Sequence, residues 1–239
     1  MLRMRWPALQ PRSLPGEKRS SYSENNQMKQ PSGIVLIVDD DPSVRTSLQR
    51  LFSSVGLAAQ GFESAEQFSA AAVPDIPGCL IVDVRLPGPS GLEFQDRLLR
   101  AGISIPIIFI SGHGDVRTTV RAMKGGAIEF LTKPLHDQEL LDVVYSALQQ
   151  DKARREQDEV RSQLKAKFDS LTKREREVMA LVVTGRLNKQ IADDLTISEI
   201  TVKLHRGQVM KKMRARSVVE LVKMSERLSS PGAGFDRRH

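Results

Sequence analysis

Short apolar runs alternate with amphipathic stretches from residue 34 to residue 150. Ile34–Val38 consists entirely of aliphatic residues, which is typical of a strand buried on both faces of a sheet. Asp41 and Pro42 then supply a cap and a first-turn proline for a helix that ends at Gly56. Further strands are predicted at Leu57–Gln60, which is the weakest, Leu80–Val82, Pro106–Ile110 and Ile128–Thr132.

Helix-capping signals separate these strands. Ser64 begins one predicted helix, and Ser90 with Glu93 forms a capping box for the next. A helix over residues 115–124 and a closing helix from Asp137 complete the series. Strands that alternate with helices at these lengths predict an α/β fold, a doubly wound parallel sheet of five strands.

The pattern changes after this region. Residues 151–167 are mostly charged and predict a helical linker. Val160, Leu164 and Phe168 recur at four-residue spacing, but three apolar positions are too few for a coiled-coil seam.

Four short helices are predicted in residues 168–230, which therefore form an all-α domain. The tight turn at residues 196–198 joins the second and third of them into a helix-turn-helix. In such a motif the second helix enters the major groove of DNA. The helices are predicted to be capped by Thr172 with Glu175, Asn188, Ser198, and Ser217 with Glu220, and to end near Val183, Leu195, Met213 and Leu228.

Charge divides the chain at the same place. Residues 32–150 carry 14 acidic and nine basic side chains, whereas residues 151–239 carry 13 acidic and 21 basic ones. A basic second region is expected to have an anionic partner such as nucleic acid. Residues 1–31 and 231–239 lack periodicity, and we expect a disordered basic extension and a disordered tail.

Composition excludes two classes of protein. The single cysteine cannot support a disulfide framework, which favours a reducing, cytoplasmic location. Nothing approaches the run of about 18 apolar residues that a membrane span requires.

Polar side chains of the types that take part in phosphoryl transfer follow the predicted strands. The carboxyl ends of parallel strands lie along one edge of the sheet, where ligands bind. Clustered carboxylates repel one another unless a divalent cation lies among them, and Mg²⁺ prefers oxygen ligands. Aspartate can accept a phosphoryl group covalently, and a lysine can neutralise the added charge. These residues are Asp39, Asp40 and Asp41, of which Asp41 is assigned to the helix cap, then Asp83, Ser111 and Lys133.

These motifs resemble those of a response-regulator receiver domain. They are Val38-Asp39-Asp40, Val82–Gly88, Phe109–Gly112 and Leu131–Pro134, within residues 32–150. The resemblance implies that Asp83 accepts a phosphoryl group from a sensor histidine kinase. It also implies ligands for Mg²⁺, namely Asp40 and Asp83 directly, Asp39 through water, and the backbone carbonyl of Arg85. Ser111 and Lys133 would stabilise the phosphoryl group, and Phe130 occupies the switch-aromatic position.

The third helix of the second region sorts its residues by helical spacing of about 100° per residue. Val202, Val209 and Met213 face the predicted core. The opposite half carries Lys203, Leu204, Gly207, Gln208 and Lys211.

Roles follow for several of these side chains. Lys203 is the best candidate to read a base edge, and Leu204 could contact a thymine methyl group. Gly207 either allows close approach of DNA or is merely tolerated in the helix. His205 either packs against the domain core or contacts a base edge. Phosphate contacts suit Lys189, Arg206, Lys211 and Lys212, whose alternative is a solvated helix face.

This second region resembles the LuxR-type DNA-binding domain. The matching motifs are Leu171–Val178, Asn188–Ala192 and Thr201–Arg206. With the receiver in front, the chain resembles a FixJ-type response regulator, which implies double-stranded DNA as a partner and a homodimer after phosphorylation. The predicted DNA-binding residues are Asn188, Lys189, Thr201, Lys203, Leu204, His205, Arg206, Gly207 and Lys211.

Three functions compete for this sequence. The first is a phosphorylation-switched transcription factor, which is not an enzyme. The second is an aspartyl-phosphate hydrolase, a class that carries a second aspartate two residues after the nucleophile, where this chain has Arg85. The third is a regulator that works without phosphate, against which the complete acidic set with Lys133 argues.

Overall fold

The computed structural model describes residues 33–72, 74–112 and 114–229. The predicted extension at residues 1–31 and the predicted tail at residues 231–239 therefore lie outside the described residues. Within the described ranges, no helix has both the length and the apolar character needed to cross a membrane.

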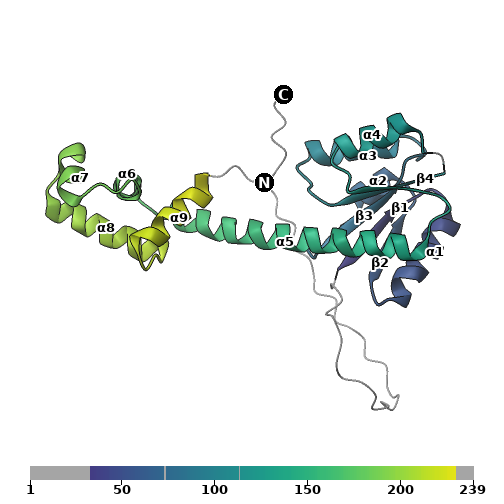
Figure 1. Ribbon diagram of the computed structural model, residues 1–239, viewed down its shortest axis with the longest axis horizontal. Helices are drawn as coiled ribbons and strands as arrows, with labels where there is room; N and C mark the ends of the chain where they lie inside the picture. Colours follow the sequence, from purple (N-terminus) through teal and green to yellow (C-terminus); the bar gives the residue numbers. More distant parts are fainter. Residues whose placement is uncertain (1–32, 73, 113, 230–239) are drawn as a thin grey trace, which may run out of the picture. The chain divides into compact units, whose positions relative to one another are not determined.

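The first region is a five-stranded parallel sheet in the order β2-β1-β3-β4-β5, which confirms the predicted α/β class (Figure 1). Strand order reverses between β1 and β3, the place where ligand crevices form in such sheets. Val38 of β1 lies opposite Val82 of β3, so Asp39 and Asp83 follow at neighbouring positions. The strands are β1 (Ile34–Val38), β2 (Ala58–Phe62), β3 (Gly78–Asp83), β4 (Ile107–Ser111) and β5 (Glu129–Thr132).

Helices cover both faces of this sheet (Figure 1). Alternate strand residues pack on opposite sides, because side chains of a strand point to alternate faces. One core joins the strands to Leu48 and Phe52 of α1 and to Leu140 of α5. The other joins them to Phe68 of α2 and Phe94 of α3, with α4 beside them. The helices are α1 (Pro42–Ser54), α2 (Ala65–Ala70), α3 (Gly91–Arg100), α4 (Val116–Lys124) and α5 (Asp137–Asp169).

The predicted helix caps of this region are present. Asp41 accepts a hydrogen bond from the Ser43 amide, and Ser64 accepts one from the Gln67 amide. The capping box of Ser90 and Glu93 is complete, and Asp115 caps α4.

The second region is a bundle of α6, α7, α8 and α9 around its own small core. Thr172 with Glu175 completes the predicted capping box, and Ser198 caps α8. The prediction that Asn188 caps α7 is wrong: Leu187 holds that position, and its amide donates to the Gln190 side chain. The helices are α6 (Lys173–Val183), α7 (Asn188–Leu195), α8 (Glu199–Met213) and α9 (Val218–Ser229).

Helix α5 contributes to two cores, one near each end. Leu140 packs on the sheet, whereas Leu164 and Phe168 pack with α6–α9, which accounts for their apolar spacing without a coiled-coil seam. Between them, the buried carboxylate of Asp151 accepts hydrogen bonds from the Gly78 amide at 3.0 Å and from two arginines of its own helix, Arg154 and Arg155.

Candidate functional site

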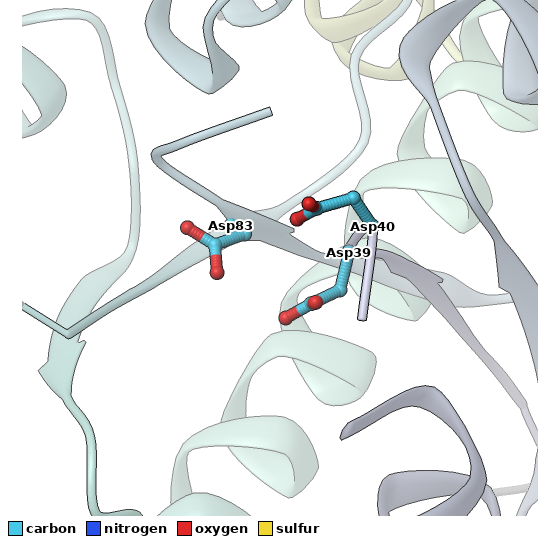
Figure 2. A group of neighbouring side chains, drawn as sticks. All are labelled: Asp39, Asp40 and Asp83. Atoms are coloured by element: carbon cyan, nitrogen blue, oxygen red, sulfur yellow. The ribbon is translucent and has the colours of Figure 1, made fainter. Parts of the chain in front are cut away.

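Three carboxylates meet at the carboxyl ends of β1 and β3. Asp39 and Asp40 follow β1, and Asp83 is the last residue of β3. One oxygen of each lies within 4.8 Å of the others, and Figure 2 shows the three side chains beside one another. Asp39 is fully buried and Asp83 is 7% exposed, whereas Asp40 faces solvent. The sheet therefore brings together the acidic residues that the sequence predicts to converge.

Lys133 joins two of these carboxylates. It follows β5, and its ammonium donates to Asp83 Oδ2 at 2.6 Å and to Asp39 Oδ2 at 2.8 Å. Burial raises the pKa of Asp39, although the hydrogen bond from Lys133 opposes that shift. Burial alone would lower the pKa of Lys133, but its hydrogen bonds to Asp39 and Asp83 outweigh it and raise that pKa. Lys133 therefore pairs with two of the three carboxylates, Asp39 and Asp83.

Backbone groups hold the remaining oxygens of the two buried carboxylates. The Asp41 amide donates to Asp39 Oδ1 at 2.9 Å, and the Arg85 amide donates to Asp83 Oδ1 at 2.7 Å. Each buried carboxylate is therefore held by an amide on one oxygen and by Lys133 on the other. Both are oriented by groups of the protein itself.

Ser111 and Phe130 come from the neighbouring strands. Ser111 is fully buried at the end of β4, and its carbonyl accepts a hydrogen bond from the Lys133 amide at 2.8 Å. Phe130 is half-buried in β5, with its ring centroid 6.4 Å from that of Phe109. Their roles in phosphoryl binding and switching stay predictions.

Asp41 lies apart from this chemistry. Its side chain faces solvent and caps α1, as predicted, and the Ser43 amide holds the pKa of its carboxyl below the usual value.

Two residues near the cluster were not found from the sequence. Arg45 donates from Nη1 to the Asp39 carbonyl at 2.6 Å, which holds the backbone of the acidic loop. Gly91 begins α3 so close to β3 that a Cβ there would lie 2.4 Å from the Asp83 carbonyl oxygen. Neither contact has a sequence signal, because each depends on how a helix packs against a strand end.

The donor set suits a hard divalent cation. Three carboxylates with converging oxygens match the oxygen coordination that Mg²⁺ prefers, with room left for water ligands because Asp40 is exposed. A carboxylate, a nearby ammonium and a cation site together form a setting for phosphoryl transfer to an aspartate.

The second candidate surface is the exposed side of the helix-turn-helix. Helices α7 and α8 are joined by a turn in which Thr196 has a positive φ of 54°. Val202, Val209 and Met213 are buried, as their helical spacing predicts. The exposed residues of α8 include Lys203, Leu204, Gly207, Gln208 and Lys211, and Lys189 of α7 is exposed as well.

Two of the side chains predicted to contact DNA phosphates make hydrogen bonds within the protein. Lys212 Nζ donates to Glu175 Oε2 at 2.6 Å, so this lysine joins α8 to α6. Arg206 Nη1 donates to Asn188 Oδ1 at 2.9 Å and thereby links the two helices of the motif.

Thr201 and His205 are both partly buried in α8. The Thr201 hydroxyl lies 2.8 Å from that of Ser198, as part of the helix cap. The DNA contacts of Asn188, Thr201, His205 and Arg206 stay predictions.

Two protein families match this sequence, one for each region. The family described as "Response regulator receiver domain" matches residues 35–145. The family described as "Bacterial regulatory proteins, luxR family" matches residues 169–225.

Full-length relatives span both regions. The chain is 55% identical to Nodulation protein W of Bradyrhizobium diazoefficiens over 82% of this chain and 86% of the relative. It is 43% identical to the transcriptional regulatory protein FixJ of Azorhizobium caulinodans over 80% of this chain and 90% of that protein. Among solved structures, the response regulator StyR matches with a TM-score of 0.75 and 46% identity, covering 82% of this chain and 99% of the StyR chain.

Proposed function

We propose that Asp83 is the phosphoryl acceptor of this chain. The chain belongs to the FixJ-type response regulators. These are phosphorylation-activated transcription regulators that carry a receiver domain and a LuxR-type DNA-binding domain. The observation that carries the assignment is the position of the Asp83 carboxylate. Asp83 ends the central strand β3 beside Asp39 and Asp40, and Lys133 holds its Oδ2 at 2.6 Å.

In the proposed reaction an Asp83 oxygen attacks phosphorus while the phosphorus–nitrogen bond of the kinase phosphohistidine breaks. The imidazole leaves, and an acyl phosphate forms on Asp83. The Asp83 oxygen that Lys133 now contacts belongs to the reacting group, so the ammonium is already placed to pair with the new phosphoryl charge. Ser111 at the end of β4 would donate to a phosphoryl oxygen.

Asp39, Asp40, Asp83 and the Arg85 carbonyl would hold Mg²⁺. Bound there, the cation would offset negative charge on the transferring phosphoryl group. Asp40 is the exposed member of the set and is free of the Lys133 contact that occupies both of the others. We therefore assign to Asp40 the largest share of cation capture.

Double-stranded DNA is the proposed target of the second region, through the exposed side of α8. The proposed response to phosphorylation is pairing of two receivers through the face formed by α4 and β5. Val116, Val120 and Met123 of α4 are exposed apolar residues, and they support a contact on this face.

The test of the acceptor compares two neighbouring carboxylates. The full chain is incubated with Mg²⁺ and acetyl phosphate, and acid-labile, hydroxylamine-sensitive labelling is measured. Asp83→Asn should abolish labelling, whereas Asp41→Asn should retain it, because Asp41 only caps α1. Labelling that survives in Asp83→Asn and disappears in Asp41→Asn would overturn the assignment.

A further inference from the structure

Arg45 of α1 holds a backbone group at the carboxyl end of β1. Its Nη1 donates a hydrogen bond to the Asp39 carbonyl oxygen at 2.6 Å. The Asp39 amide donates to the Phe62 carbonyl of β2 at 3.2 Å. Both backbone polar groups of Asp39 are therefore held within the protein, the amide by the neighbouring strand and the carbonyl by the arginine.

The carbonyl that Arg45 holds belongs to the peptide between Asp39 and Asp40. Because a peptide group is planar, the direction of its C=O bond sets the direction in which the chain continues to the Asp40 Cα. Asp40 is exposed, and both of these aspartates extend their side chains toward Asp83 (Figure 2). Arg45 therefore acts on the position of Asp40 through the backbone, at the residue to which cation capture is assigned.

Gly61 of β2 leaves room for the arginine stem. It lies opposite Ile37 of β1, and its φ is not among the positive ones, so its backbone does not require glycine. A Cβ built at Gly61 would lie 3.3 Å from Arg45 Cδ, 3.4 Å from Arg45 Cβ and 3.4 Å from Gln49 Nε2. A glycine inside a strand weakens the strand and often marks a place where another group approaches closely. Here the group that approaches is the stem of Arg45.

We propose that Arg45 is a positioning residue for the Mg²⁺ site. It fixes the peptide between Asp39 and Asp40 and so aims the Asp40 carboxylate at the cation, and Gly61 keeps the path of its side chain open. Partners that orient metal ligands in this way change metal affinity by about 10–100-fold when they are removed. The inference rests on the proposed Mg²⁺ site and adds two residues that carry no metal ligand themselves.

The first test separates positioning from stability. Mg²⁺ affinity is measured by calorimetric titration of the full chain, and the melting temperature is measured on the same samples. Arg45→Met keeps an apolar stem over Gly61 but removes the donor, and its Mg²⁺ affinity should fall about tenfold or more. Arg45→Lys should recover most of that loss, because a single hydrogen bond to the Asp39 carbonyl needs only one N–H donor. A lower melting temperature with unchanged Mg²⁺ affinity would show that Arg45 only ties α1 to the sheet.

The second test reaches the site through Gly61. The branched side chain in Gly61→Val should displace the Arg45 stem and lower Mg²⁺ affinity several-fold. In the Arg45→Met background the same change should have no further effect on Mg²⁺ affinity, since the donor is already absent. This double-mutant cycle measures the coupling between the two positions. Equal losses in both backgrounds, or an unchanged affinity in Gly61→Val, would contradict the proposed path.

Two further variants complete the design. Arg50→Met makes the same substitution at an exposed arginine of α1 and should bind Mg²⁺ as the wild type does. Asp40→Ala removes a proposed ligand and should bind no Mg²⁺. Wild-type affinity in Arg45→Met, together with lost binding in Asp40→Ala, would overturn the positioning role and leave the Mg²⁺ site standing. Wild-type affinity in Asp40→Ala would overturn the Mg²⁺ site itself, and the positioning role with it.

Discussion

The acidic cluster of the receiver and the exposed face of α8 place functional side chains by different means. The cluster draws its carboxylates from the ends of two strands, and Lys133 reaches it from beyond a third strand. Two of the three carboxylates are buried, and amide and ammonium groups hold both of them. The face of α8 belongs to one continuous helix, and its candidate reading residues extend into solvent.

This difference predicts different responses to substitution. Residues of the cluster share partners, so a change at one of them alters the environment of the others. Residues on the exposed face of α8 do not share partners in this way, and their effects on DNA binding should be graded and nearly additive. Substitutions in the two regions should therefore differ in both the size and the selectivity of their effects.

The largest effect is expected at Asp40. Asp40→Ala removes one of the two direct side-chain ligands for Mg²⁺ and should abolish both Mg²⁺ binding and phosphorylation by acetyl phosphate. Calorimetric titration with Mg²⁺ measures the binding directly. Asp115→Ala, which removes a helix cap outside the cluster, is the control and should bind Mg²⁺ normally. Unchanged Mg²⁺ affinity in Asp40→Ala would contradict the site.

A large loss of stability is expected at Asp151. Asp151→Ala leaves the Gly78 amide and two arginines without their shared buried acceptor and should cost about 3–5 kcal/mol of unfolding free energy. Asp158→Ala provides the comparison. It removes the exposed partner of the same Arg154 and should cost at most about 1 kcal/mol. Denaturant unfolding of both variants measures the difference, and similar losses would show that the buried carboxylate has no special role.

A smaller and more selective effect is expected at Lys203. Lys203→Ala should cost about 1–3 kcal/mol on the preferred duplex while nonspecific binding is nearly retained, as for a base contact. Lys211→Ala should instead weaken binding to all sequences alike and reduce the salt dependence by about one unit. The expected difference follows from their positions, since residues near the N-terminus of a recognition helix meet bases. Competition binding with the preferred duplex and a scrambled duplex, at several salt concentrations, tests both variants. Equal losses on the two duplexes for Lys203→Ala would show that Lys203 does not contact a base.

The smallest effect is expected at Glu175. The hydrogen bond from Lys212 lowers the pKa of this carboxyl from 4.5. Glu175→Gln should therefore cost about 1 kcal/mol near pH 7, where the carboxylate is charged in both the folded and unfolded states. Because the folded-state pKa is depressed, this contribution is lost as the pH falls through it. Denaturant unfolding at pH 7 and at a series of pH values falling from 4.5 should show the difference between the two proteins shrinking as the pH falls. A constant difference would exclude the charge as the cause.

Much of the receiver could be predicted from the sequence because its signals are local. The aliphatic run at Ile34–Val38 and the caps at Ser64 and Ser90 depend only on nearby residues, and the structure has all of them. The convergence of Asp39 and Asp83 could also be predicted, because parallel strands place their carboxyl ends along one edge of the sheet. The prediction that Asn188 caps α7 was wrong, because Leu187 occupies the N-cap position. The Leu187 amide donates its hydrogen bond to the Gln190 side chain, which comes from the first turn of the helix.

The succession of strands and helices along the chain, the acidic edge of the sheet and the exposed face of α8 could all be predicted from local signals. Periodicity, caps and charge are properties of neighbouring residues, so the linear order of the chain is enough to specify them. Three contacts depend on packing instead: Lys133 holds Asp39 and Asp83 together, Lys212 pairs with Glu175, and Asp151 accepts a hydrogen bond from the Gly78 amide. These contacts join residues far apart in the chain, and their side chains meet only after strands and helices have packed.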